Sequence, residues 1–132
     1  MAKKEITEEE LLRRALDFWK HQFKIVDWDI SLEFVLRSGF SDFDRAGEIE
    51  IDSEHRKALI KVVSKEEESH PSWEVDRKKV LAHEFSHILL WVFPIPAGEG
   101  IDFKVYEQTV NIMAEGIRNM TDWDSLKKKK KG

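Results

Sequence analysis

The sequence predicts an α+β domain in which an N-terminal helix, a three-stranded sheet and two further helices follow one another. Apolar residues recur every three or four positions near the start and in the second half of the chain, as they do in helices. Between these stretches they alternate with polar residues, as in strands. At 132 residues the chain can bury one core of its own. We therefore expect helices packed on one face of a mainly antiparallel sheet.

The first helix is expected over residues 7–23. Thr7 and Glu10 have the spacing of a capping box, in which the threonine side chain binds the backbone N–H three residues later. The apolar residues that follow form a helical stripe: Leu11, Leu12, Ala15, Leu16, Phe18, Trp19 and Phe23. This stripe indicates an amphipathic helix with one face against the core.

Three strands are expected after this helix. Apolar and polar residues alternate strictly over 28–36, which indicates a strand with one buried face. The alternation returns over 47–52 and again over 58–63, with a polar turn between them. Because the strand at 58–63 leads toward the next helix, we predict that it is the sheet edge to which an extended peptide adds.

The next helix, expected over 80–93, contains the motif His83-Glu84-Phe85-Ser86-His87, which reads H-E-x-x-H. On an α-helix His83 and His87 lie one turn apart on the same face, so both imidazoles can bind one ion. Glu84 flanks that ion and can act as the general base toward a water that zinc makes acidic. The apolar flanks predict a buried helix, which favours one Zn²⁺ per chain over a chance match on a surface helix.

A catalytic zinc site usually has three protein ligands and one open position. No histidine follows His87 and the chain has no cysteine, so the third ligand must be a downstream carboxylate. The candidates are Glu99, Asp102, Glu107 and Glu115. We favour Glu107, on a helix expected over 102–120, because Asn111 follows one turn later and can accept a hydrogen bond from a ligand histidine. Glu115 stays an alternative for either role.

These residues resemble the gluzincin zinc metallopeptidases, in which H-E-x-x-H is followed by a glutamate ligand. Here nineteen residues separate His87 from Glu107, whereas Tyr106 and Asn111 depart from the usual Asn-Glu-x-x-x-Asp segment. The small size is similar to that of minigluzincins and of short metallopeptidase domains of phages and mobile elements. The order of elements is also similar to that of these domains. The corresponding segments are a strand that begins Trp28-Asp29-Ile30, a strand Gly47-Glu48-Ile49-Glu50-Ile51-Asp52, and a helix end His87-Ile88-Leu89-Leu90-Trp91.

The resemblance implies a minimal zincin core, with an HExxH helix and a glutamate helix, and a zinc-dependent endopeptidase. In that reading His83, His87 and Glu107 bind zinc, and Glu84 is the general base. Two alternatives stay open: a zinc-binding regulatory or adaptor domain without turnover, and a latent peptidase whose own C-terminal segment at 121–124 blocks the cleft. Several residues are candidates for stabilising the oxyanion: Tyr106, His70, His55 and Arg56.

The charge distribution separates a domain at 1–121 from a lysine-rich C-terminal tail at 122–132. Without the five lysines at 127–131, 17 basic residues stand against 26 acidic ones, a net charge of −9. Such an acidic domain disfavours nucleic acid as a partner. The sequence contains neither a signal peptide nor an apolar run long enough to cross a bilayer. We expect a cytoplasmic monomer with a peptide or protein substrate and no membrane partner.

Overall fold

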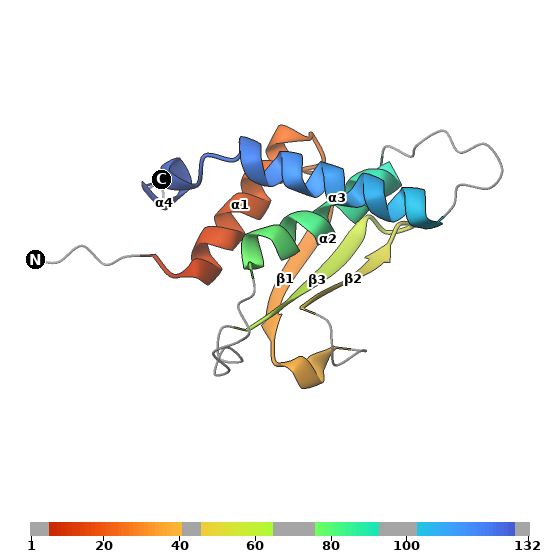
Figure 1. Ribbon diagram of the computed structural model, residues 1–132, viewed down its shortest axis with the longest axis horizontal. Coiled ribbons are helices and arrows are strands. Elements are labelled where there is room, and N and C mark those ends of the chain that lie inside the picture. Colours follow the sequence, from red (N-terminus) through yellow and green to blue (C-terminus); the bar gives the residue numbers. More distant parts are fainter. Residues whose placement is uncertain (1–5, 41–45, 65–75, 93–102, 129–132) are drawn as a thin grey trace, which may run out of the picture.

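The computed structural model describes residues 6–40, 46–64, 76–92 and 103–128, and it confirms the α+β class. Helices cover one face of a three-stranded sheet, and no described helix lies on the other face (Figure 1). The elements in chain order are α1 (Glu8–Gln22), β1 (Asp29–Val35), the 3₁₀ turn η1 (Arg37–Gly39), β2 (Gly47–Asp52), β3 (Lys57–Val63), α2 (Arg77–Val92), α3 (Phe103–Met120) and α4 (Trp123–Lys128). None of the described helices is both long and apolar enough to cross a membrane.

The first helix begins where the capping pattern predicts. The Thr7 side chain accepts a hydrogen bond from the backbone N–H of Glu10 at 3.1 Å, which satisfies one of the free donors of the first turn. Five residues of the predicted stripe are buried: Leu11, Leu12, Ala15, Leu16 and Trp19. Phe18 lies at the border of the stripe and is exposed.

The sheet is mixed, with strand order β1-β3-β2. β2 and β3 form the expected antiparallel hairpin, whereas β1 pairs with β3 in parallel. β3 is the most apolar of the three strands, and its residues Ile60, Val62 and Val63 are fully buried. Its place in the middle of the sheet gives this strand a neighbour on both sides.

The prediction that the strand at 58–63 is a free edge is therefore wrong. All residues of β3 pair with β1, and those from Lys57 to Val62 also pair with β2. A strand with partners on both sides has no free backbone groups for a peptide. Among the described residues, β1 and β2 are the edge strands, and β2 is the one beside α2 and the site described below.

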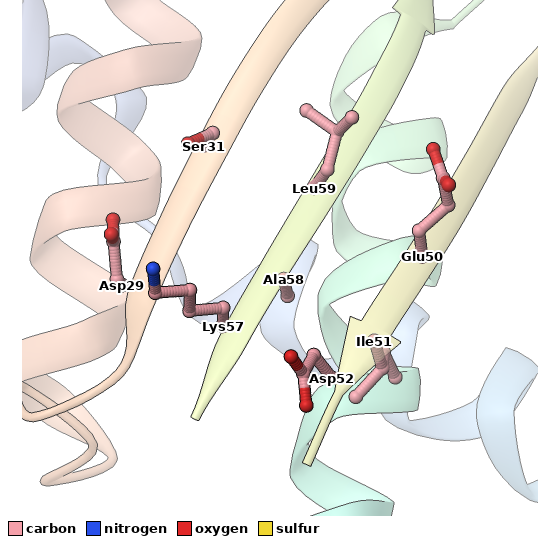
Figure 2. Close-up of a pocket in the computed structure, with 8 residues that line it drawn as sticks. All are labelled: Asp29, Ser31, Glu50, Ile51, Asp52, Lys57, Ala58 and Leu59. Carbon is pink, nitrogen blue, oxygen red and sulfur yellow. The ribbon is translucent and has the colours of Figure 1, made fainter. Parts of the chain in front are cut away.

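The sheet face opposite the helices is polar. Figure 2 shows the side chains of Asp29, Ser31 and Lys57 on this face, where they line a shallow hollow with residues of β2. Lys61 on the same face lies 3.4 Å from a carboxylate oxygen of Glu50 and 3.8 Å from one of Glu48. The alternation in sequence thus separates a charged, solvated face from the apolar face that packs on the helices.

Helix α2 is buried around most of its circumference because the sheet, α1 and α3 all pack against it. Its first turn is capped by Asp76, whose carboxylate accepts a hydrogen bond from the backbone N–H of Lys79 at 3.1 Å. Arg77 is buried, and its Nε donates to the carbonyl oxygen of Val63 at 2.8 Å. These contacts join the end of β3 to the start of the helix that contains the histidines.

The C-terminal segment forms a short helix, α4, that the sequence did not indicate. Arg14 of α1 donates from Nη1 to the carbonyl oxygens of Leu126 and Lys127, at 2.8 and 3.3 Å. Trp19 donates from its indole nitrogen to the hydroxyl of Thr121 at 2.9 Å. Residues 121–127 are therefore held against α1.

Candidate metal centre

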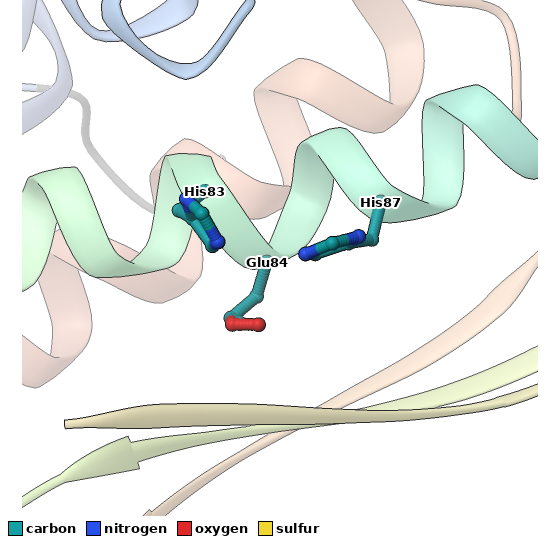
Figure 3. A group of neighbouring side chains, drawn as sticks. All are labelled: His83, Glu84 and His87. Atoms are coloured by element: carbon teal, nitrogen blue, oxygen red, sulfur yellow. The ribbon is translucent and has the colours of Figure 1, made fainter. Parts of the chain in front are cut away.

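Helix α2 presents the side chains of His83, Glu84 and His87 together. The two imidazole rings have centroids 5.1 Å apart. One ligand atom from each of the three side chains lies within 4.8 Å of the other two, a spacing at which they can hold a metal ion. Figure 3 shows both rings on the same stretch of α2 and the Glu84 carboxylate pointing toward the sheet. Glu84 is only 6% exposed, and both histidines are half-buried.

The three side chains line a cleft of about 540 Å³ between α2, the start of β2 and the first turns of α3. Glu107 lines the same cleft from α3, because α2 and α3 pack side by side. The remaining described lining residues are Ala46, Gly47, Lys79 and Val80. Glu107 thus shares a cleft with the H-E-x-x-H motif from a separate helix, although its carboxylate is not part of the group whose ligand atoms lie within 4.8 Å of one another.

The other carboxylates considered as ligands differ in position. Glu115 is exposed two turns farther along α3 and does not line the cleft. Glu99 and Asp102 lie outside the described residues. Among the described acids, Glu107 is therefore the downstream carboxylate best placed to join the two histidines.

Tyr106 takes the place beside a histidine that the sequence suggested for Asn111. Its hydroxyl oxygen lies 3.0 Å from Nδ1 of His87, within hydrogen-bond distance, whereas Asn111 is exposed. The residue next to the predicted ligand thus contacts the second histidine of the motif. Spacing along α3 could not reveal this contact because it depends on how α3 is rotated against α2.

Burial shifts the pKa values of His87 and Tyr106. Desolvation lowers the pKa of His87, the neighbouring His83 lowers it further, and the charge of Glu107 opposes both effects. Desolvation also raises the pKa of Tyr106, and the nearby Glu107 carboxylate adds to that shift. At neutral pH the site therefore holds a neutral imidazole, the form that binds a metal, and a neutral phenol.

The donor set fits a divalent transition metal. Imidazole nitrogens and carboxylate oxygens suit Zn²⁺, and they also suit other first-row ions. The neutral state of His87 and the cleft that the described residues leave beside the motif meet two further requirements of such a site. The residues of the motif could thus hold a metal ion.

Gly47 allows β2 to approach α2 at this point. A Cβ at this position would lie 2.4 Å from Cγ1 of Val80 and 3.4 Å from Cγ of Glu84. Side-chain atoms in proteins do not approach so closely, so any larger residue forces β2 or Val80 to move. The glycine that begins β2 thus permits the close approach of this strand to Val80 and Glu84.

Replacing Gly47 with alanine is expected to lower the free energy of unfolding by about 1–3 kcal/mol, the usual cost of overpacking. Urea unfolding of the wild type and the variant measures this difference in the free energy of unfolding. The matched control is Gly116→Ala in α3, where an added Cβ meets no atom within 4 Å. There alanine should stabilise the helix by up to about 1 kcal/mol.

A double-mutant cycle attributes the effect to the contact with Val80. Val80→Ala removes the atom that lies 2.4 Å from the added Cβ, so Gly47→Ala should cost much less in that background. Equal costs in the two backgrounds would show that another contact is responsible.

The remaining candidates for stabilising an oxyanion lie elsewhere. His55 and Arg56 are in the turn after Asp52, at the opposite end of β2 from Gly47. There His55 hydrogen-bonds the Asp52 carboxylate at 2.8 Å, and Arg56 pairs with Asp27. His70 lies outside the described residues. Of the three candidates among the described residues, Tyr106 is the one that lies beside the motif.

The C-terminal segment does not enter the cleft over its described length. Trp123 packs edge-on against Trp19 with ring centroids 6.0 Å apart, and its indole nitrogen donates to the carbonyl oxygen of Arg118. No residue of 121–128 lines the cleft. This arrangement argues against a cleft blocked by residues 121–124.

A comparison of the chain with protein-family models, with curated proteins and with solved structures found no match. The chemistry of the site therefore rests on the residues and geometry described above.

Proposed function

We propose that the protein is a zinc-dependent endopeptidase of the gluzincin type. The observation that carries this proposal is the position of Glu84, whose buried carboxylate lies beside two histidines and faces a cleft. A purely structural zinc site has no use for such a carboxylate and normally fills the fourth position with a protein ligand. The site is thus better suited to hydrolysis than to a structural role alone.

His83, His87 and Glu107 would hold the metal. When bound, the metal supplies a Lewis acid and makes a water acidic near neutral pH. Glu84 has a separate role, in which its carboxylate accepts a proton from the attacking water and returns it to the nitrogen of the leaving amine. Both transfers need a carboxylate that reaches into the cleft, which is where Glu84 lies.

The edge of β2 offers a place for an extended peptide. Within the described residues β2 pairs with β3 on one side only, and its first residue Gly47 lines the cleft next to Glu84. A peptide added along this edge would run past the Glu84 carboxylate. Binding along a strand edge favours cleavage at internal peptide bonds. In this proposal β2, and not β3 as the sequence suggested, is the edge to which the peptide adds.

The test is metal content followed by cleavage. We expect about one zinc per chain in the dialysed protein by elemental analysis, and loss of that zinc in His83→Ala. We further expect the zinc-loaded protein to cut a mixture of peptides at internal bonds, identified by mass spectrometry. Zinc without any cleavage would favour a regulatory or adaptor domain, and absence of zinc uptake would contradict the metal centre.

A further inference from the structure

Tyr106 and His87 form a contact between two helices at the candidate metal centre. The tyrosine hydroxyl oxygen lies 3.0 Å from Nδ1 of His87, and the two ring centroids are 5.7 Å apart. The tyrosine immediately precedes Glu107, so the first turns of α3 place both residues near the motif. One face of α3 thus supplies a carboxylate to the cleft and a hydroxyl to the imidazole.

The partner of Nδ1 decides what the other ring nitrogen can do. A neutral imidazole has one N–H donor and one acceptor nitrogen. If Nδ1 carries the hydrogen and donates it to the tyrosine oxygen, Nε2 keeps its lone pair for a metal. If instead the phenol donates to Nδ1, the hydrogen resides on Nε2 and blocks it. The contact at 3.0 Å therefore bears directly on the ability of His87 to act as a ligand.

We propose that Tyr106 is a positioning residue of the metal centre, whose hydroxyl oxygen accepts the Nδ1 hydrogen of His87 and keeps Nε2 free toward the cleft. This inference rests on the metal site of the proposed function. It assigns to a phenol the role that a carboxylate or a backbone carbonyl usually has beside a ligand histidine. Asn111 is exposed and is not the residue that hydrogen-bonds His87.

The substitution Tyr106→Phe removes the hydroxyl and keeps the ring that packs on His87. We expect it to weaken zinc affinity by about 10–100-fold, the usual effect of losing a hydrogen bond to a ligand histidine. Affinity is measured by competition with a chromogenic chelator, and circular dichroism checks that the fold is retained. The matched control is Asn111→Ala on the same helix, which should leave zinc affinity unchanged.

A second measurement does not require zinc or activity. Nitrogen NMR of the metal-free wild type should show His87 with its hydrogen on Nδ1, and Tyr106→Phe should shift the ring toward a mixture of both tautomers. Hydrogen on Nε2 in the wild type would overturn the proposal. Unchanged zinc affinity in Tyr106→Phe would overturn it as well, even if peptide turnover fell, because the hydroxyl would then act on substrate.

The two readouts separate this inference from the proposed function. A protein that binds zinc, binds it more weakly in Tyr106→Phe and cuts no peptide would retain the positioning role and lose the peptidase proposal. A protein that takes up no zinc would remove the metal centre, and with it the role of Tyr106 as a positioning residue for a ligand.

Discussion

Replacing Glu84 with glutamine is expected to lower kcat/KM for peptide hydrolysis by about 10²–10⁴-fold, the contribution of a general base. Glutamine keeps the size of the side chain and its reach into the cleft, but its amide cannot accept a proton from water. Zinc should stay bound, because the proposed ligands are His83, His87 and Glu107. Initial rates on an internally quenched peptide, with zinc content measured on the same samples, test this result.

Glu115→Gln is the matched control for this substitution. Glu115 is exposed on α3 and does not line the cleft, so the same chemical change there should alter neither rate nor zinc content. Loss of zinc in Glu115→Gln would contradict the choice of Glu107 as the third ligand. Unchanged cleavage in Glu84→Gln would contradict the mechanism, whatever the metal content.

The largest effect on stability is expected for Trp19→Ala, at about 3–5 kcal/mol. Trp19 is fully buried, and its ring lies against Phe85 of α2 with centroids 5.4 Å apart. Its indole nitrogen also donates to Thr121, which joins α1 to the segment before α4. Alanine leaves a large cavity and removes the donor to the Thr121 hydroxyl, which keeps its own hydrogen bond to the carbonyl oxygen of Ile117. Since small domains have about 5–15 kcal/mol in total, urea unfolding should show a much less stable protein.

Trp91→Ala provides the comparison for Trp19→Ala. Trp91 is 57% exposed at the end of α2, so the same truncation should change the free energy of unfolding by no more than about 0.5 kcal/mol. Trp19→Phe keeps most of the packing and removes the indole donor, which isolates the hydrogen bond to Thr121. Similar losses for Trp19→Ala and Trp91→Ala would show that the packing around Trp19 is not a principal source of stability.

The sequence by itself determined the local features of this protein. The capping residue Thr7 and the stripe behind it fixed the first helix, and the strand at 47–52 has the predicted bounds. The cluster of His83, Glu84 and His87 was also predictable, because neighbours four residues apart on a helix meet on the same face. These features depend on contacts within one or two helical turns or along one strand. The periodicity of the sequence therefore reveals them directly.

Tertiary structure decided several features that join distant segments. It placed β3 in the middle of the sheet and left β2 as the edge beside the cleft. It brought Tyr106 rather than Asn111 to His87, because the rotation of α3 against α2 selects which side chain faces the imidazole. It also made Gly47 the point of close approach between β2 and α2, and packed residues 121–127 on α1. These outcomes depend on how the faces of separate helices and strands pack against one another. Because the contacting residues lie far apart in the chain, no periodic pattern in the sequence reveals their contact.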